Sequence, residues 1–410
     1  MFVLPASFKG KMRPFFALPL AILVAFAAAC GSSDNHAAVG GGGDASSPGT
    51  DTGGGGASAQ PDGAIAGGDD AGVHGGGDDA WVPVTDAGAG ASGDGALHDA
   101  GSCGSCPQGF GCNASGTYCV NGRGVPAFDH VIIIVMENES QTDIQGSSQA
   151  PYVQQLLAKY SYTNQYSTTY HPSLPNYLDL TSGSAQGITC DCQPVGTACD
   201  STCSFFTGNC GCPKSATNIG DQLEGASVSW RNYAESMGAP CNGTLAAPYA
   251  PKHVPFLYYS NVYTNTSRCQ QHVRDYGDFA ADLAVGTVRY SLIAPNLCSD
   301  MHGDPSCPSS VPNITQGDSW LGQEVPKILK APGFAPGGKD VLFIVWDEQT
   351  GSTGGASTPM LLIAVSPLAK TGPTAIAYNH ESLLATVEDS FGLSRLGGAA
   401  SATPITDIWK

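Results

Sequence analysis

Three apolar runs in this 410-residue sequence each lead directly into a set of polar side chains. The runs are residues 130–136, 288–295 and 340–346. The polar residues that follow them include Glu137, Asn138, Asp300, His302, Asp347 and Glu348. Carboxylate and amide oxygens are ligands that hard divalent cations prefer, whereas a thiolate site suits softer metals. These residue types therefore indicate an oxygen-rich metal site with a histidine nearby.

Ser173 is a candidate nucleophile, because Pro172 and Pro175 restrict the backbone that presents its hydroxyl. The residues after it can begin a helix, and a helix N-terminus favours an anionic ligand. A metal ion beside Ser173 would activate the hydroxyl without the help of a histidine base. The alternative interpretation of this segment is a turn serine that caps the helix.

The elements that must position these residues alternate between strands and helices. The three apolar runs are rich in β-branched residues and have the length of buried strands, and residues 359–366 form a fourth such run. Helices are expected over residues 151–160, 178–182, 318–330 and 379–391. This alternation predicts an α/β fold with a mostly parallel central sheet and helices on both faces. Reactive residues gather beyond the carboxyl ends of the strands in such sheets, so the three polar sets should meet.

Six motifs, spread over about residues 127–395, give the sequence a resemblance to a known family. They are Met136-Glu-Asn-x-Ser140, His171-Pro-Ser-x-Pro-Asn-Tyr177, Tyr249-x-x-Lys-His-x-Pro-Phe256, Pro295-Asn-x-Cys-x-Asp-Met-His302, Trp346-Asp-Glu348 and Tyr378-Asn-His-x-Ser-Leu-Leu-x-Thr386. In this order they resemble the phosphoesterase family, which unites bacterial phospholipases C of the phosphatidylcholine type with secreted acid phosphatases. That family belongs to the alkaline phosphatase superfamily, so the resemblance implies an alkaline phosphatase-like fold.

The resemblance also implies a role for individual residues. A divalent metal ion, whether Ca²⁺, Mg²⁺, Mn²⁺ or Zn²⁺, would be held by Glu137, Asn138, Asp347 and Glu348. Ser173 would be the nucleophile, and the other catalytic residues would be His253, Asp300 and His302. The residues expected to bind the substrate are Asn176, Lys252 and His380.

These features predict an exported, metal-dependent phosphoesterase that hydrolyses phosphate monoesters through a serine nucleophile. Its substrate would be a phosphorylated small molecule or a phospholipid. A phospholipase C-type phosphodiesterase is the alternative, although the phospholipases of the family that the sequence resembles are typically much longer.

Two other classes of protein fit the sequence less well. A serine esterase of the α/β-hydrolase type would need a Gly-x-Ser-x-Gly elbow, which the sequence lacks. Gly317–Trp320 imitates the block that opens the GDSL-type esterases, but it lies late in the chain. A non-catalytic surface-binding lipoprotein is disfavoured, because an inactive relative would be expected to lose the nucleophile or the metal ligands.

The N-terminal hundred residues carry targeting signals and no predicted fold. Residues 1–29 are typical of a lipoprotein signal peptide, because Arg13 precedes an apolar core and three alanines lead into Cys30. Lipidation of Cys30 would anchor the exported protein to a membrane, at the outer membrane or cell surface of a bacterium. An ordinary cleaved signal with a chance cysteine is the alternative. Residues 30–100 should form a disordered tether, since residues 31–100 contain 21 Gly and 11 Asp but no Lys, Arg or Glu.

The net charge of −18 argues against a nucleic-acid-binding protein, which would need a basic stripe.

The 14 cysteines other than Cys30 are an even number, as expected for disulfides in an oxidising compartment. Residues 101–123 should form a small disulfide-rich segment, with a zinc site as the alternative. Its cysteines are Cys103, Cys106, Cys112 and Cys119. Two further disulfides are expected, Cys241–Cys269 and Cys298–Cys307.

The other six cysteines lie within residues 190–212, which are expected to form a surface insertion that narrows or covers the site. Residues 124–410 would then be the phosphoesterase domain. The pairing of the cysteines inside the insertion stays open.

Overall fold

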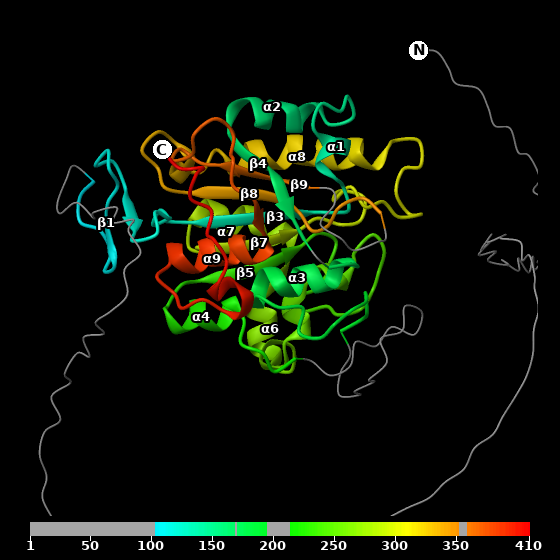
Figure 1. Ribbon diagram of the computed structural model, residues 1–410. Helices are drawn as coiled ribbons and strands as arrows, with labels where there is room; N and C mark the ends of the chain where they lie inside the picture. Colours follow the sequence, from blue (N-terminus) through cyan, green and yellow to red (C-terminus); the bar gives the residue numbers. More distant parts are fainter. Residues whose placement is uncertain (1–102, 169, 195–213, 352–358) are drawn as a thin grey trace, which may run out of the picture. The chain divides into compact units, whose positions relative to one another are not determined.

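One large sheet organises the chain in the computed structural model, which describes residues 103–168, 170–194, 214–351 and 359–410. Its nine strands are β3 (Val131–Met136), β4 (Ser161–Ser167), β5 (Trp230–Ala234), β6 (Val273–Asp275), β7 (Tyr290–Ala294), β8 (Val341–Trp346), β9 (Met360–Val365), β10 (Gly372–Pro373) and β11 (Tyr378–Asn379). The order is β10-β4-β9-β8-β3-β7-β5-β6, with β11 also paired to β4 (Figure 1). Within this sheet only β9 runs antiparallel to its neighbours, β8 and β4. The predicted mostly parallel sheet is confirmed.

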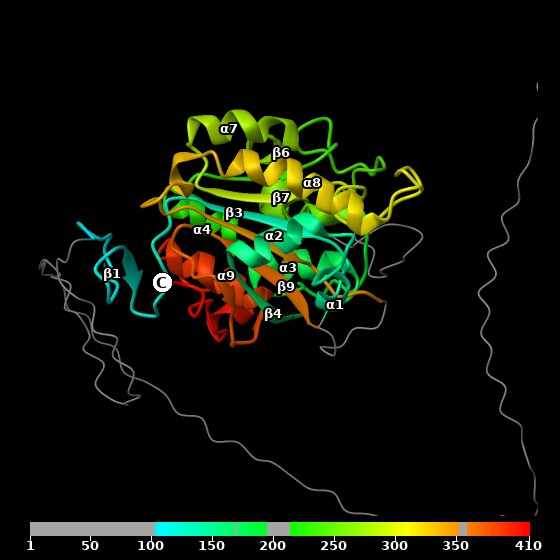
Figure 2. The ribbon, with the colours of Figure 1, turned by 90° about the horizontal axis from the view of Figure 1, so that it is seen from above.

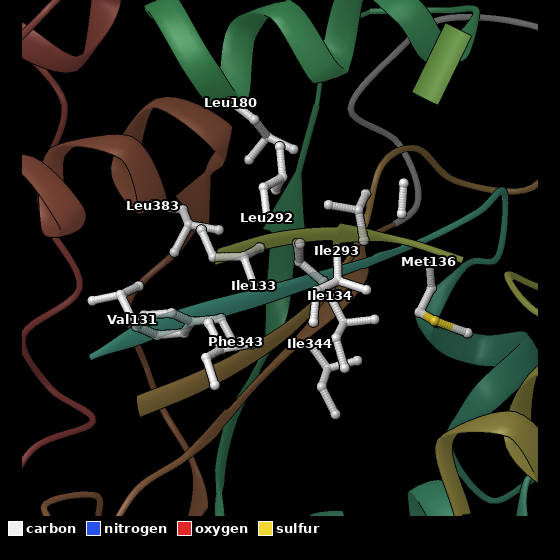
Figure 3. Packing of buried hydrophobic residues seen from close by; sticks show 14 of the residues in the cluster. Val131, Ile133, Ile134, Met136, Leu180, Leu292, Ile293, Phe343, Ile344 and Leu383 are labelled. Atoms are coloured by element: carbon white, nitrogen blue, oxygen red, sulfur yellow. The ribbon is translucent and has the colours of Figure 1, made fainter. Parts of the chain in front are cut away.

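The centre of the sheet consists of β3 and β8, in which every residue is buried. Both strands are apolar along their whole length, as strands covered on both faces must be. Ile133 of β3 is paired with Leu292 of β7, so the two side chains lie on the same face. Leu180 and Leu383 approach that face from two helices (Figure 3).

Helices cover both faces of the sheet, as the sequence predicts. They are α1 (Gln141–Ile144), α2 (Pro151–Lys159), α3 (Ser173–Ser182), α4 (Ile219–Gly225), α5 (Ser260–Tyr263), α6 (Thr266–His272), α7 (Phe279–Val285), α8 (Asn313–Ile328) and α9 (His380–Ser390). The pair α2 and α8 packs on one face, and the pair α3 and α9 packs on the other (Figures 1 and 2). The helix expected over residues 318–330 begins earlier, at Asn313, directly after Pro312. Pro312 fixes the backbone at the point where the helix starts.

A small antiparallel hairpin precedes the sheet and consists of β1 (Phe110–Cys112) and β2 (Cys119–Asn121). The hydroxyl of Tyr118 donates a hydrogen bond to the backbone carbonyl of Lys410, which joins the hairpin to the last residue. Four disulfides are described: Cys103–Cys112, Cys106–Cys119, Cys241–Cys269 and Cys298–Cys307. They confirm the two predicted disulfides of the cysteine-rich segment and both of the other predicted pairs.

The predicted signal peptide, Cys30 and the tether lie outside the described residues. No helix in the described part of the chain has the length and apolar composition needed to cross a membrane.

Candidate active site

The carboxyl ends of three neighbouring strands meet at one edge of the sheet. The backbone amide of Glu137, after β3, donates to the carbonyl of Asp300, after β7, at 2.8 Å. The amide of Asp347, after β8, donates to the carbonyl of Met136 at 2.9 Å. The three polar sets therefore come together as the parallel arrangement predicts.

Four oxygen-bearing side chains converge there, the amide of Asn138 and the three carboxylates that surround it. One terminal atom of its amide lies 3.2 Å from a carboxylate oxygen of each of three residues: Glu137, Asp347 and Glu348. Asn138 itself has a positive φ of 51°, a conformation that Asn adopts more readily than most residues. This turn at the end of β3 aims the amide toward the carboxylates.

The electrostatics of this group favour a bound cation. Burial and the neighbouring carboxylates raise the pKa of Glu137 and of Asp347 well above the usual range, and they raise the pKa of Glu348 to about 10. Asp347 Oδ2 is buried and has no hydrogen-bond donor. A divalent cation would satisfy these acceptors and neutralise their charge. The donor set fits a hard divalent metal ion.

Ser173 lies against this carboxylate group as the first residue of α3. Its side chain is 1 % exposed, and its Oγ donates a hydrogen bond to Glu137 Oε2 at 2.9 Å. The ammonium of Lys252 is 3.4 Å from the same Oγ. Burial opposes the charge of Lys252, but Asp191 and Glu137 outweigh that effect and raise the pKa of the ammonium above its usual value. The hydroxyl is thus held between a carboxylate and a permanent positive charge.

Two histidines complete the site. His253 is buried and stacks on the ring of Tyr177, with centroids 5.1 Å apart. Its Nε2 is 3.3 Å from Glu137 Oε1 and its Nδ1 is 3.4 Å from Asp300 Oδ2. Burial, Lys252 and His302 lower the pKa of His253, which favours the neutral ring.

His302 lies beside His253, with ring centroids 6.4 Å apart. Its Nδ1 donates to the carbonyl of Gly303 at 2.8 Å. Its backbone amide donates to Asp300 Oδ1 at 2.8 Å. Asp300 therefore contacts both histidines and fixes their relative position.

Two residues expected to bind substrate have their polar atoms occupied by the protein itself. The Asn176 amide donates to Glu348 Oε2 at 3.0 Å, and its oxygen accepts from Thr168 at 2.5 Å. The ring of His380 contacts the Tyr166 hydroxyl at 2.9 Å and the Asp347 carbonyl at 2.6 Å. The structure therefore shows Asn176 in contact with Glu348 and His380 in contact with Asp347, and the predicted contact of both residues with a substrate stays a prediction.

The late Gly317–Trp320 block has a structural role. Asp318 accepts hydrogen bonds from the backbone amides of Tyr152 and Val153, at 3.0 and 2.8 Å, and so caps the first turn of α2. No esterase site is formed by this segment.

Three residues near the site were not identified from the sequence: Asp191, Tyr177 and His171. The Tyr177 hydroxyl donates to Glu137 Oε1 at 2.5 Å, and His171 Nδ1 is 3.1 Å from Glu348 Oε2. Both lie in the motif that contains Ser173, which is the signal that could have revealed them. Asp191 gave no such signal, because it lies between two cysteines of the predicted surface insertion.

That insertion does not begin at the surface. Cys190 and Cys192 are 7 % and 2 % exposed, so the expectation of a surface position is wrong for this part. Asp191, between these two cysteines, contacts Lys252 at 2.7 Å, so this part of the segment lies against the site. The other four cysteines of the insertion lie outside the described residues.

Comparison with known proteins agrees with the motifs. The sequence model of the phosphoesterase family matches residues 146–394. Over 286 residues the chain is 31 % identical to a phosphatidylinositol-3-phosphatase of Mycobacterium tuberculosis, an alignment that covers 70 % of this chain and 84 % of that protein. It is 25 % identical to an acid phosphatase of Aspergillus fumigatus, over 57 % of this chain and 49 % of that protein.

Solved structures show a more distant likeness. The lipoteichoic acid synthase LtaP of Listeria monocytogenes aligns with 70 % of this chain and 80 % of its own, at 12 % identity and a TM-score of 0.46. That score is too low to carry an argument about function. The sequence matches are sufficient by themselves, and the chain belongs to the phosphoesterase family and is a hydrolase of phosphoric ester bonds.

Proposed function

We propose that the protein is an exported, metal-dependent phosphatase that hydrolyses phosphate monoesters with Ser173 as its nucleophile. The observation that carries this proposal is the position of Ser173 Oγ, at hydrogen-bond distance from Glu137 and 3.4 Å from the Lys252 ammonium. Phosphoryl transfer depends on a positioned nucleophile and on positive charge beside the phosphoryl oxygens. The positions of Ser173 and Lys252 support the proposal on both points.

The residues that would hold the metal ion are Glu137, Asn138, Asp347 and Glu348. When bound, the ion would supply positive charge to the phosphoryl oxygens and favour ionisation of the Ser173 hydroxyl. Its identity among Ca²⁺, Mg²⁺, Mn²⁺ and Zn²⁺ is left open by the donor types. Replacement of Asp347 by Asn should lower the metal content of the purified protein, measured by elemental analysis.

The proposed reaction has two displacements. With Ser173 ionised, its Oγ attacks phosphorus, the bond to the alcohol oxygen breaks, and His302 gives that oxygen a proton. Water then attacks the phosphoserine and gives up a proton to the same histidine, and the bond between phosphorus and Oγ breaks to release phosphate and the ionised serine. Lys252 and His253 would contact the phosphoryl oxygens in both steps.

The relatives favour a phosphatase over a phospholipase C. Three relatives carry the names phosphatidylinositol-3-phosphatase, acid phosphatase and probable acid phosphatase. A phosphorylated small molecule and a phosphorylated lipid are both compatible with these names. The site residues alone do not separate the two.

The test is a panel of substrates assayed with and without a chelator and with each metal added back. We expect p-nitrophenyl phosphate or a phosphoinositide monoester to release phosphate, and we expect the chelator to abolish that release. Faster cleavage of bis(p-nitrophenyl) phosphate or phosphatidylcholine would instead support the phosphodiesterase alternative. Activity unaffected by exhaustive chelation would contradict the metal requirement.

We also propose that lipidation of Cys30 anchors the exported protein to a bacterial membrane. The described disulfides support export, because such bonds persist in oxidising compartments. Replacement of Cys30 by Ala should abolish labelling by a fatty acid and move the protein from the membrane fraction to the soluble fraction. A variant that stays in the membrane fraction would contradict the anchor.

A further inference from the structure

The carboxylate of Asp191 bridges the two segments that present reactive groups to the site. Its Oδ2 is 2.7 Å from Lys252 Nζ, and its Oδ1 accepts a hydrogen bond from the backbone amide of Leu174 at 3.0 Å. Leu174 is the residue after Ser173 in α3, and Lys252 lies in a short 3₁₀ turn, Pro251–His253. One side chain from a third segment thus joins the nucleophile's helix to the cation beside the nucleophile.

Asp191 supplies helix α3 with an N-terminal cap and the Lys252 ammonium with a carboxylate partner. The residue before α3 is Pro172, which has no side chain that can accept a hydrogen bond from the first turn. Asp191 takes that capping role from 17 residues further along the chain, and its charge also suits a helix N-terminus. On the other side, it gives the Lys252 ammonium a partner other than the carboxylates around Asn138.

The backbone of Asp191 is fixed from both directions. Cys190 and Cys192 are both buried, and both are disulfide-bonded. A short aspartate side chain between two cross-linked residues has little freedom to move. It therefore sets the place of the ammonium with more precision than a surface residue could.

We infer that Asp191 is a positioning residue for phosphoryl transfer, which acts by holding the Lys252 ammonium 3.4 Å from Ser173 Oγ. The described start of the cysteine-rich insertion, residues 190–194, then takes part in positioning the catalytic groups. This inference rests on the proposed function of Ser173 and Lys252.

The inference predicts a specific kinetic signature. Asp191→Asn keeps an oxygen that can accept from Leu174 but removes the negative charge that holds Lys252. A misplaced catalytic group commonly lowers turnover by about tenfold to a hundredfold. We expect a loss of that size in kcat, with KM for p-nitrophenyl phosphate changed by less than about threefold, because the ammonium matters most when charge develops in the transition state.

A double-mutant cycle shows whether Asp191 acts through Lys252. The kcat of Asp191→Asn, Lys252→Gln and the double variant would be compared with that of the wild-type chain. Residues that act as one unit give non-additive losses, so the double variant should be no slower than Lys252→Gln alone. Losses that multiply would show independent roles and overturn the inference, as would an Asp191→Asn variant with wild-type kcat.

Asp221 provides a matched control. It accepts from the Asn218 amide in the capping box of α4 and pairs with Arg268 at 2.7 Å, and none of its described hydrogen bonds or ion pairs involves a site residue. Asp221→Asn also removes a capping carboxylate that pairs with a cation, so it should lower the melting temperature while leaving kcat unchanged. An equal loss of kcat in both variants would make the effect of Asp191 one of general stability and refute a positioning role.

Asp191→Glu keeps the inference testable if Asp191→Asn fails to fold. The longer side chain retains the charge but displaces the ammonium, so kcat should fall by at least about fivefold. Wild-type turnover in this variant would overturn the inference. A wild-type chain that releases no phosphate from any monoester would instead refute the proposed function, so the two failures are distinguishable.

Discussion

Replacement of Ser173 by Ala separates the contribution of this residue to stability from its contribution to catalysis. In the folded protein the hydroxyl donates a hydrogen bond to Glu137 Oε2 and accepts a longer one from Lys252, whereas Glu137 Oε1 keeps its bond from Tyr177. The loss of these two bonds costs about 1–3 kcal/mol in the free energy of unfolding. A domain with the usual stability of about 5–15 kcal/mol stays folded after that loss.

The expected effect on catalysis is much larger. Deletion of a serine nucleophile that forms a covalent intermediate commonly lowers kcat by about three to six powers of ten. At about 1.4 kcal/mol per power of ten, that is about 4–8 kcal/mol of activation free energy. A nucleophile is identified by a loss of catalysis that is much larger than the loss of stability, because replacement of a purely structural serine lowers the stability and leaves most of the activity.

The assay measures phosphate release from p-nitrophenyl phosphate by the metal-loaded variant, together with its melting temperature and metal content. Ser182→Ala is the matched control, because Ser182 is buried in the same helix and donates to the Leu178 carbonyl at 2.9 Å. We expect Ser182→Ala to keep nearly full activity. If Ser173→Ala retains more than about a tenth of wild-type activity, Ser173 is not the nucleophile, and direct attack by water becomes the better mechanism.

Three further predictions concern the proposed acid His302, the glycine that ends α3, and the pair formed by His130 and Asp340. His302→Ala should slow an alkyl phosphate by about a hundredfold or more but p-nitrophenyl phosphate far less, because a good leaving group needs little protonation; equal losses for the two substrates would argue against this role. Gly183→Ala should lower the free energy of unfolding by about 2–3 kcal/mol in denaturant titrations, since Gly183 ends α3 with φ 66° and a Cβ there would lie 2.5 Å from the Leu396 carbonyl oxygen. The hydrogen bond to Asp340 raises the pKa of His130 above its usual 6.5, so the pair stabilises the fold fully below about pH 6.5 and loses this contribution as the pH rises through the folded-state pKa. The difference in unfolding free energy between wild type and His130→Gln, about 1 kcal/mol in acid, should therefore shrink toward alkaline pH, and a constant difference would refute the assignment.

The parts of the fold that the sequence predicts well are those with uninterrupted apolar composition. Buried central strands leave such a pattern, so β3 and β8 are found at nearly the expected residues. The polar residues that follow them meet because parallel strands place their carboxyl ends at one edge. Both facts depend only on local composition and on a general rule of sheet geometry.

The sequence gives less warning of β4, whose seven residues are Ser, Thr, Asn, Gln and Tyr. This strand pairs with β9 and carries no alternating apolar pattern, so its place is decided by tertiary packing. The same limit applies to Asp191. Its importance depends on a contact with Lys252 across 61 residues of chain, and no local pattern records a contact of that kind.

The pairing of β3 with β8 has a consequence for how the enzyme comes into existence. Val131 is paired with Val341, so the two central strands are separated by 341 − 131 = 210 residues. Closing a loop of that length is slow, because the chain must be ordered before the pairing stabilises it. A nascent chain that ends before β8 would already contain Ser173, Lys252 and both site histidines. It would lack β8 and the two site carboxylates that follow it, Asp347 and Glu348. Activity should therefore appear only once nearly the whole domain has folded.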